Sequence, residues 1–264
     1  MLSAAAIAAA LTTRWLGRTL EYYPELGSTN VRLAELAAAG APAGTLVITD
    51  HQTAGRGRLG RRWEAPPGSG LLFSLLYRPD WPAERAIWLT MLTALAGRDV
   101  LKKHTGAPIY LKWPNDLLGG PPPHAKLAGI LMESALVDDR VDWLIVGMGL
   151  NVNLSADQLP VAASPPTSLQ LLAGRPLDRL ALLVDLLAAL ERRFAAAEQG
   201  VSPLAEWSAA LINQGRRVMV HPAGGEPWSG IACGTDEWGR LLVERSDGTV
   251  QAVAAADVSL RPLA

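Results

Sequence analysis

The sequence of 264 residues has one cysteine, four lysines and almost no net charge, −1 by formal count. A lone cysteine, Cys233, excludes an intrachain disulfide and fits a reducing compartment such as the cytoplasm. The balanced charge leaves no basic surplus to neutralise nucleic-acid phosphates. No apolar run is long enough to span a bilayer, and the alanine-rich start lacks the basic segment of a signal peptide. We therefore expect a cytoplasmic globular protein in which Cys233 is a small buried side chain.

Apolar residues make up 49% of the chain and follow two kinds of pattern. Helical spacing predicts helices over 1–11, 28–39, 84–104 and 177–197, and a shorter one between Ser202 and Gly215. Short apolar or alternating runs predict strands over 45–49, 71–77, 109–112, 127–137 and 141–148, the last two as an antiparallel pair. Four more strand-like runs follow residue 215 without helices between them, which is typical of a small β-barrel. The pattern indicates an α+β chain with a large domain over 1–213 and a barrel over 214–264.

A basic, glycine-rich loop lies between the strands predicted at 45–49 and 71–77. Residues 55–62, Gly-Arg-Gly-Arg-Leu-Gly-Arg-Arg, place four arginines and three glycines together, and Trp63 follows. Glycines let backbone N–H groups approach a ligand, and arginines offer forked donors to carboxylates and phosphates. The loop therefore fits a clamp over an anionic ligand, with Trp63 offering an aromatic face. Its composition alone fits a solvated loop or an RNA-binding segment equally well, but its place after a buried strand in a non-basic chain favours the clamp.

Three further motifs carry polar side chains at the ends of predicted strands: Lys112-Trp113-Pro114-Asn115-Asp116, Lys126-Leu127-Ala128-Gly129-Ile130 and Gly147-Met148-Gly149-Leu150-Asn151. The Asn115–Asp116 pair can bind an adenine edge, a ribose or Mg²⁺, although an Asx turn explains it too. Lys126 can stabilise charge on a reacting carboxylate and phosphate, or extend along an apolar edge to solvent. Asn151 can bind adenine, or belong to an ordinary strand-to-loop turn.

From Ser28-Thr29-Asn30 through the GRGR loop and KWPND to KLAGI and GMGLN, the motifs in this order resemble the biotin–protein ligase family. The resemblance covers most of the chain, and five motifs in the right order are very specific. It implies a mixed-sheet catalytic domain of the class II synthetase-like biotin/lipoate ligase type, followed by a small SH3-like β-barrel. It also implies an enzyme that forms biotinyl-5′-AMP from biotin and Mg·ATP and transfers biotin to a lysine of a biotin carboxyl carrier protein.

The resemblance implies a role for each matching position. Biotin would contact residues of the first motif and of the loop: Ser28, Thr29, Asn30, Gln52, Gly55, Arg56, Gly57 and Arg58, together with Lys126. The nucleotide would be bordered by Trp63, Asn115, Asp116 and Asn151. Lys126 and Arg58 would be the catalytic residues, because they would neutralise the biotin carboxylate and the α-phosphate as these anions meet. No metal ligand is assigned.

Two departures and three alternatives accompany the resemblance. The stretch between Asp116 and Lys126 looks longer than the family's usual turn. Only 27 residues precede Ser28, too few for the DNA-binding winged helix of some members, so we expect no DNA binding and no repressor activity. The alternatives are a lipoate–protein ligase, which GRGR and KWPND disfavour, a non-catalytic ligand- or RNA-binding module, and a ligase with a regulatory role. A homodimer through an exposed strand at 141–146 is a further expectation.

Overall fold

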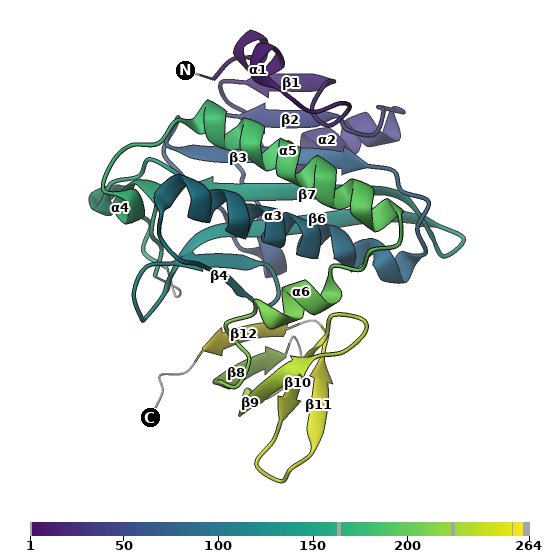
Figure 1. Cartoon of the computed structure of the whole chain (residues 1–264), viewed down its shortest axis with the longest axis vertical. Helices are drawn as coiled ribbons and strands as arrows, with labels where there is room; N and C mark the ends of the chain where they lie inside the picture. The colour runs from purple at the N-terminus through teal and green to yellow at the C-terminus, as the bar shows by residue number, and fades with distance from the viewer. Residues whose placement is uncertain (1, 163–164, 223–224, 255, 261–264) are drawn as a thin grey trace.

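The computed structural model describes residues 2–162, 165–222, 225–254 and 256–260, and Figure 1 shows two β-sheets of unequal size. The larger sheet has the strand order β1-β2-β3-β7-β6-β5-β4. Only β1 and β2 run parallel, and the other neighbours are antiparallel. Its strands are β1 (Leu20–Tyr23), β2 (Leu46–Thr49), β3 (Gly70–Tyr77), β4 (Ile109–Lys112), β5 (Asp116–Gly119), β6 (Ala125–Val137) and β7 (Arg140–Asn151).

Helices cover both faces of this sheet. Figure 1 shows α3 (Ile87–Thr105) and α5 (Arg179–Glu198) crossing one face. On the other face α2 (Thr29–Ala38) buries Leu33 against Val47 and Ile145. Because both faces are covered, β2 and β3 are apolar along nearly their whole length, and every residue of both is buried. The remaining helices are α1 (Ala4–Ala10), α4 (Leu169–Ala173) and α6 (Leu204–Ala209), with short 3₁₀ turns at Arg58–Gly60, Ala83–Ala86 and Ala156–Gln158.

The smaller sheet is antiparallel and lies beyond β4 and α6 in Figure 1. Its order is β11-β10-β9-β8-β12, with β8 (Arg217–Pro222), β9 (Trp228–Thr235), β10 (Leu241–Glu244), β11 (Val250–Val253) and β12 (Ala256–Leu260). A buried tryptophan, Trp113, joins the two sheets: its backbone N–H donates to Asn213 Oδ1 at 2.8 Å and its indole N–H to the Gly239 carbonyl at 3.0 Å. The predicted α+β class with a small C-terminal β unit is confirmed, and the boundary between residues 213 and 214 stays a prediction.

The structure corrects three expectations and adds three strands. The strand at 141–146 is part of β7, which pairs with β6 along one edge and, from Leu144 onwards, with β3 along the other, while the Val141 N–H donates to the Trp81 carbonyl, so this strand is not the exposed edge that was expected. Cys233 is exposed, because it lies on the outward side of β9 while Ala232 points into the core. The last predicted helix ends at Ala209. Strands β1, β5 and β12 were not predicted. No helix in the described ranges combines the length and apolarity that crossing a membrane requires.

Candidate active site

The predicted motifs meet on the middle strands of the large sheet. The pairing register places Asp116 of β5 opposite Gly129 of β6, and Gly129 opposite Gly149 of β7. Leu131, two residues along β6, faces Gly147. Residues that lie far apart in the sequence therefore share one small area of sheet. The β5–β6 pairing has a register shift between Leu117 and Leu118, and across the long loop Lys126 reaches the Asp116 carboxylate.

The backbone of this area is glycine-rich and forms the floor of the site. Side chains from other parts of the chain lie directly on it. A Cβ atom added at Gly149 would lie 2.5 Å from Trp63 Cε2, and one at Gly129 would lie 3.2 Å from Trp63 Cζ3. A Cβ atom at Gly147 would lie 2.0 Å from Asn30 Oδ1. Any larger residue at Gly147 or Gly149 would have to displace the indole or the carboxamide that lies on the sheet.

Gly149→Ala tests how the indole and the floor fit together. We expect Trp63 to lift off β7 and the basic loop to loosen, so that trypsin cleaves after the loop arginines several-fold faster than in the wild type. Gly27→Ala is the matched control, because no atom lies within 4 Å of its added Cβ. Equal cleavage rates for Gly149→Ala and the wild type would contradict this packing.

A polar cluster occupies one end of the floor, beside the start of α2. Thr29 donates from its backbone N–H and its hydroxyl to Gln52 Oε1, at 2.9 and 3.1 Å. The Ser74 hydroxyl lies 2.7 Å from Thr29 Oγ1 and donates to Asn30 Oδ1 at 2.6 Å. Ser28 is buried at the N-cap of α2, and its side chain makes no capping hydrogen bond. The cluster offers hydroxyl and amide groups to a neutral polar ring.

The basic loop folds back on itself over the floor. The backbone N–H of Trp63 donates to the Gly55 carbonyl at 3.0 Å, and the backbone N–H of Gly57 donates to the Arg61 carbonyl at 2.7 Å. Arg58 donates to Asn115 Oδ1 at 3.4 Å. Burial lowers the pKa of Arg58, and the nearby Asp116 carboxylate opposes that shift. An arginine that is partly stripped of water beside an acidic group is well placed to receive an anionic ligand.

Two lysines converge on Asp116, which is 9% exposed. Lys126 Nζ lies 2.7 Å from Asp116 Oδ1, and Lys112 Nζ lies 3.7 Å from Oδ2. Burial lowers the pKa of Lys112, while the Asp116 carboxylate acts in the opposite direction. Lys126 Nζ also lies 5.8 Å from the centre of the Trp63 ring. With Arg58, three cations surround one carboxylate, so the area carries an excess of positive charge.

Two buried polar atoms near this charge lack partners within the described residues: Asn151 Oδ1 and Trp63 Nε1. The Asn151 carboxamide is fixed from its other end, where Nδ2 donates to the Thr167 carbonyl at 3.0 Å. A buried polar atom without a partner costs about 1–3 kcal/mol. One free acceptor beside the floor and one free donor above Gly149 are therefore features of a ligand site.

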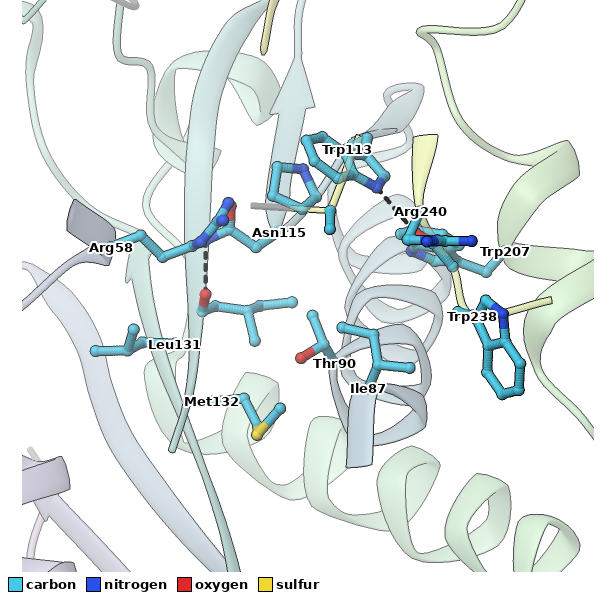
Figure 2. Close-up of a pocket in the computed structure, with 14 residues that line it drawn as sticks. Arg58, Ile87, Thr90, Trp113, Asn115, Leu131, Met132, Trp207, Trp238 and Arg240 are labelled. Carbon is cyan, nitrogen blue, oxygen red and sulfur yellow. Dashed lines mark hydrogen bonds between the residues drawn. The ribbon is translucent and has the colours of Figure 1, made fainter. Parts of the chain in front are cut away.

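A cavity of about 170 Å³ adjoins the site on the side of the small sheet. Figure 2 shows Arg58 and Asn115 along one side, and Trp207, Trp238 and Arg240 along the other. Asn115 is held to β6, because its Nδ2 donates to the Ile130 carbonyl at 2.7 Å. The cavity therefore lies between the charged end of the site on the large sheet and residues that adjoin the small sheet.

The structure brings the predicted site residues into one region, with the polar cluster and the charged groups around Asp116 on either side of Trp63. It also adds Ser74, Lys112 and Glu133, to which the sequence had assigned no role. Ser74 was detectable as a polar residue inside an apolar strand, and Lys112 as part of KWPND. Across the described ranges, no group of three or more His, Cys, Asp or Glu side chains could hold a metal ion.

Comparisons with known proteins agree with this arrangement. A model of the biotin/lipoate A/B protein ligase family matches residues 24–151, and one of the biotin protein ligase C-terminal domain matches residues 215–261. The chain is 35% identical to the bifunctional ligase/repressor BirA of Bacillus subtilis, over 98% of this chain and 79% of that protein. It is 36% identical to the biotin–[acetyl-CoA-carboxylase] ligase of Mycobacterium tuberculosis, over 91% and 88% of the two chains.

Solved structures share the fold. A biotin protein ligase from Aquifex aeolicus, in complex with biotin and ATP, has a TM-score of 0.72 and 27% sequence identity, and the match covers 92% of this chain and 99% of that one. The likeness therefore includes both sheets, and the predicted ligase-type fold is confirmed. On this evidence the chain belongs to the biotin protein ligase family.

Proposed function

We propose that this chain activates biotin with Mg·ATP as biotinyl-5′-AMP and then transfers the biotinyl group to a lysine of a biotin carboxyl carrier domain. The observation that carries the proposal is the gathering of Lys126, Lys112 and Arg58 around Asp116 beside a glycine floor. Two anions must meet for adenylation, and this is where the protein concentrates positive charge. The relatives named above support biotin as the acid, as does the match to a biotin protein ligase C-terminal domain.

Biotin would lie along the floor with its ureido ring in the polar cluster. The hydroxyl of Ser28 and the Thr29–Gln52 pair offer donors and acceptors to a ring that carries both. The acid tail would then extend past Trp63 towards Lys126. Gly55, Arg56 and Gly57 would form the part of the loop that closes over the tail and keeps water from the reacting carboxylate.

The chemistry follows from the charges at the other end. The biotin carboxylate attacks the α-phosphorus of ATP, a P–O bond forms, and pyrophosphate leaves with its electron pair. Lys126 and Arg58 would offset the repulsion between the two anions and the negative charge that builds on the phosphorus oxygens. The uncharged amine of the acceptor lysine then attacks the acyl carbon, AMP leaves, and an amide remains.

Magnesium would enter with ATP as part of the co-substrate. Mg²⁺ in nucleotide sites is held by one or two carboxylates and by phosphate oxygens, rather than by a cage of protein groups. Asp116 is the buried carboxylate at the charged end of the site, which fits that limited role. Asn115 would border the same part of the nucleotide.

Adenine would lie beside Asn151 and Trp63, whose unpartnered atoms suit a base with an amino group and ring nitrogens. We expect Asn151→Ala to raise the KM for ATP by about tenfold, in line with the loss of one buried hydrogen bond, and to leave the KM for biotin near the wild-type value. Initial rates measured with each substrate varied in turn check this. An equal rise in both KM values would remove Asn151 from the adenine site.

The adenylation step can be tested without an acceptor. The purified chain is mixed with Mg·ATP and either biotin or lipoate, and pyrophosphate release is measured. Release that depends on biotin, and is much weaker with lipoate, supports the proposal. Release with lipoate alone would identify a lipoate ligase, and release with neither acid would contradict adenylation altogether.

A further inference from the structure

Glu133 lies on β6 between two parts of the biotin site that are far apart in the sequence. Its Oε2 accepts a hydrogen bond from Asn30 Nδ2 at 2.7 Å, and its Oε1 lies 3.4 Å from Arg56 Nη1. Asn30 belongs to α2 on one side of the floor, and Arg56 to the loop that covers it. One carboxylate therefore connects the polar cluster to the basic loop.

The contact with Asn30 decides which way that carboxamide faces. A carboxylate can only accept hydrogen bonds, so the amide atom facing Glu133 must be the nitrogen. The amide oxygen is then fixed at Ser74 and above Gly147, where it accepts from the Ser74 hydroxyl at 2.6 Å. Asn30 Nδ2 also donates to the Leu131 carbonyl at 3.4 Å, a longer contact, so Glu133 is the stronger of the two acceptors that hold the carboxamide in this orientation.

The two contacts differ in strength. Asn30 is 4% exposed, and a buried hydrogen bond to a charged group is stronger than one between neutral groups. The Arg56 side chain is 52% exposed and its ion pair with Glu133 is long, so that contact contributes little. The orientation of Asn30 is therefore the larger effect, and the link to the loop is the smaller.

We propose that Glu133 is a positioning residue for biotin, which holds the Asn30 carboxamide in its binding orientation and, more weakly, draws the Arg56 arm of the loop over the site. The inference rests on the proposed function, because it names a determinant of biotin affinity in the same site. Glu133 acts through Asn30 and Arg56 rather than on the reacting atoms. Removing it changes the affinity for biotin and leaves the rate at saturating biotin largely intact.

Two substitutions separate the contacts, and calorimetric titration with biotin measures them. Glu133→Ala removes both contacts, and we expect the Kd for biotin to rise tenfold or more. Glu133→Gln keeps an acceptor for Asn30 Nδ2 and loses only the charge, so we expect a rise of about threefold or less. At saturating biotin, kcat for pyrophosphate release stays within about twofold in both variants. Glu64→Gln is the matched control, because it removes an exposed acid that directly follows Trp63 in the same loop.

The outcomes are distinct. If the wild type does not bind biotin, the proposed function fails. If the wild type binds and Glu133→Ala binds as tightly, only the role of Glu133 fails. A Glu133→Gln variant that is as weak as Glu133→Ala would show that the charge, not the orientation of Asn30, matters. A Glu133→Ala variant that does not fold would make the residue structural and would also overturn the proposal.

Discussion

Replacing Lys126 with methionine is expected to slow biotin-dependent adenylate formation by about 10²–10³-fold, the usual cost of removing one group that stabilises developing charge. Methionine keeps most of the aliphatic stem and removes the ammonium, which lies 2.7 Å from Asp116 Oδ1 and 5.8 Å from the centre of the Trp63 ring. Asp116 keeps Lys112 as a neighbour, so the buried carboxylate is not left without a cation. The loss should fall on kcat, because the ammonium is needed most when charge accumulates on the phosphate.

Single-turnover formation of radiolabelled adenylate, with biotin and Mg·ATP at saturating concentrations, gives this rate directly. Lys102→Met is the matched control, because that lysine is exposed on α3 and belongs to none of the motifs. It should react at the wild-type rate. A Lys126→Met rate within a few-fold of the wild type would remove Lys126 from the mechanism.

Gly147→Ala is expected to lower kcat/KM for biotin by about 10²-fold, because a displacement of about 1 Å at a binding group is enough for a loss of that size. The added Cβ would lie 2.0 Å from Asn30 Oδ1, and the carboxamide has little room to move. It is held from two sides, by Ser74 and by Glu133. Either the amide leaves its place or β7 shifts in the centre of the sheet.

A double variant separates damage to the fold from damage to the site. Asn30→Ala combined with Gly147→Ala removes the clash, so its melting temperature should return towards that of Asn30→Ala alone. Its affinity for biotin should stay low, because the carboxamide is gone. Recovery of biotin binding in the double variant would mean that Asn30 does not contribute to the site.

The elements with clear periodicity could be predicted from the sequence, and those fixed by pairing partners could not. The helices predicted at 28–39, 84–104 and 177–197 and the β6–β7 hairpin are confirmed, whereas the last predicted helix ends early, at Ala209. β5 escaped prediction because it consists of four residues directly after the KWPN turn and is recognisable only by its pairing with β4 and β6. The same limit placed the strand at 141–146 at an exposed edge, since its apolar pattern does not show which strands flank it.

The site shows a similar division. The order of the motifs was enough to predict the set of site residues. These residues lie close together because the motifs are at strand ends, in the loop after β2 or at the start of α2. Partners such as Ser74 and Glu133 carry no motif of their own, and only the cross-strand register places them beside Asn30. The expectations of a possible homodimer, of no DNA binding and of a cytoplasmic location remain predictions.

Transfer to a carrier domain tests the central claim most directly. The chain is incubated with biotin, Mg·ATP and a purified biotin carboxyl carrier domain, and the intact mass of the carrier is measured. We predict a gain of one biotinyl group that requires ATP and the acceptor lysine and is nearly abolished by Lys126→Met. An unchanged carrier mass, with lipoate equally inert, would contradict the assignment of this chain as a biotin ligase.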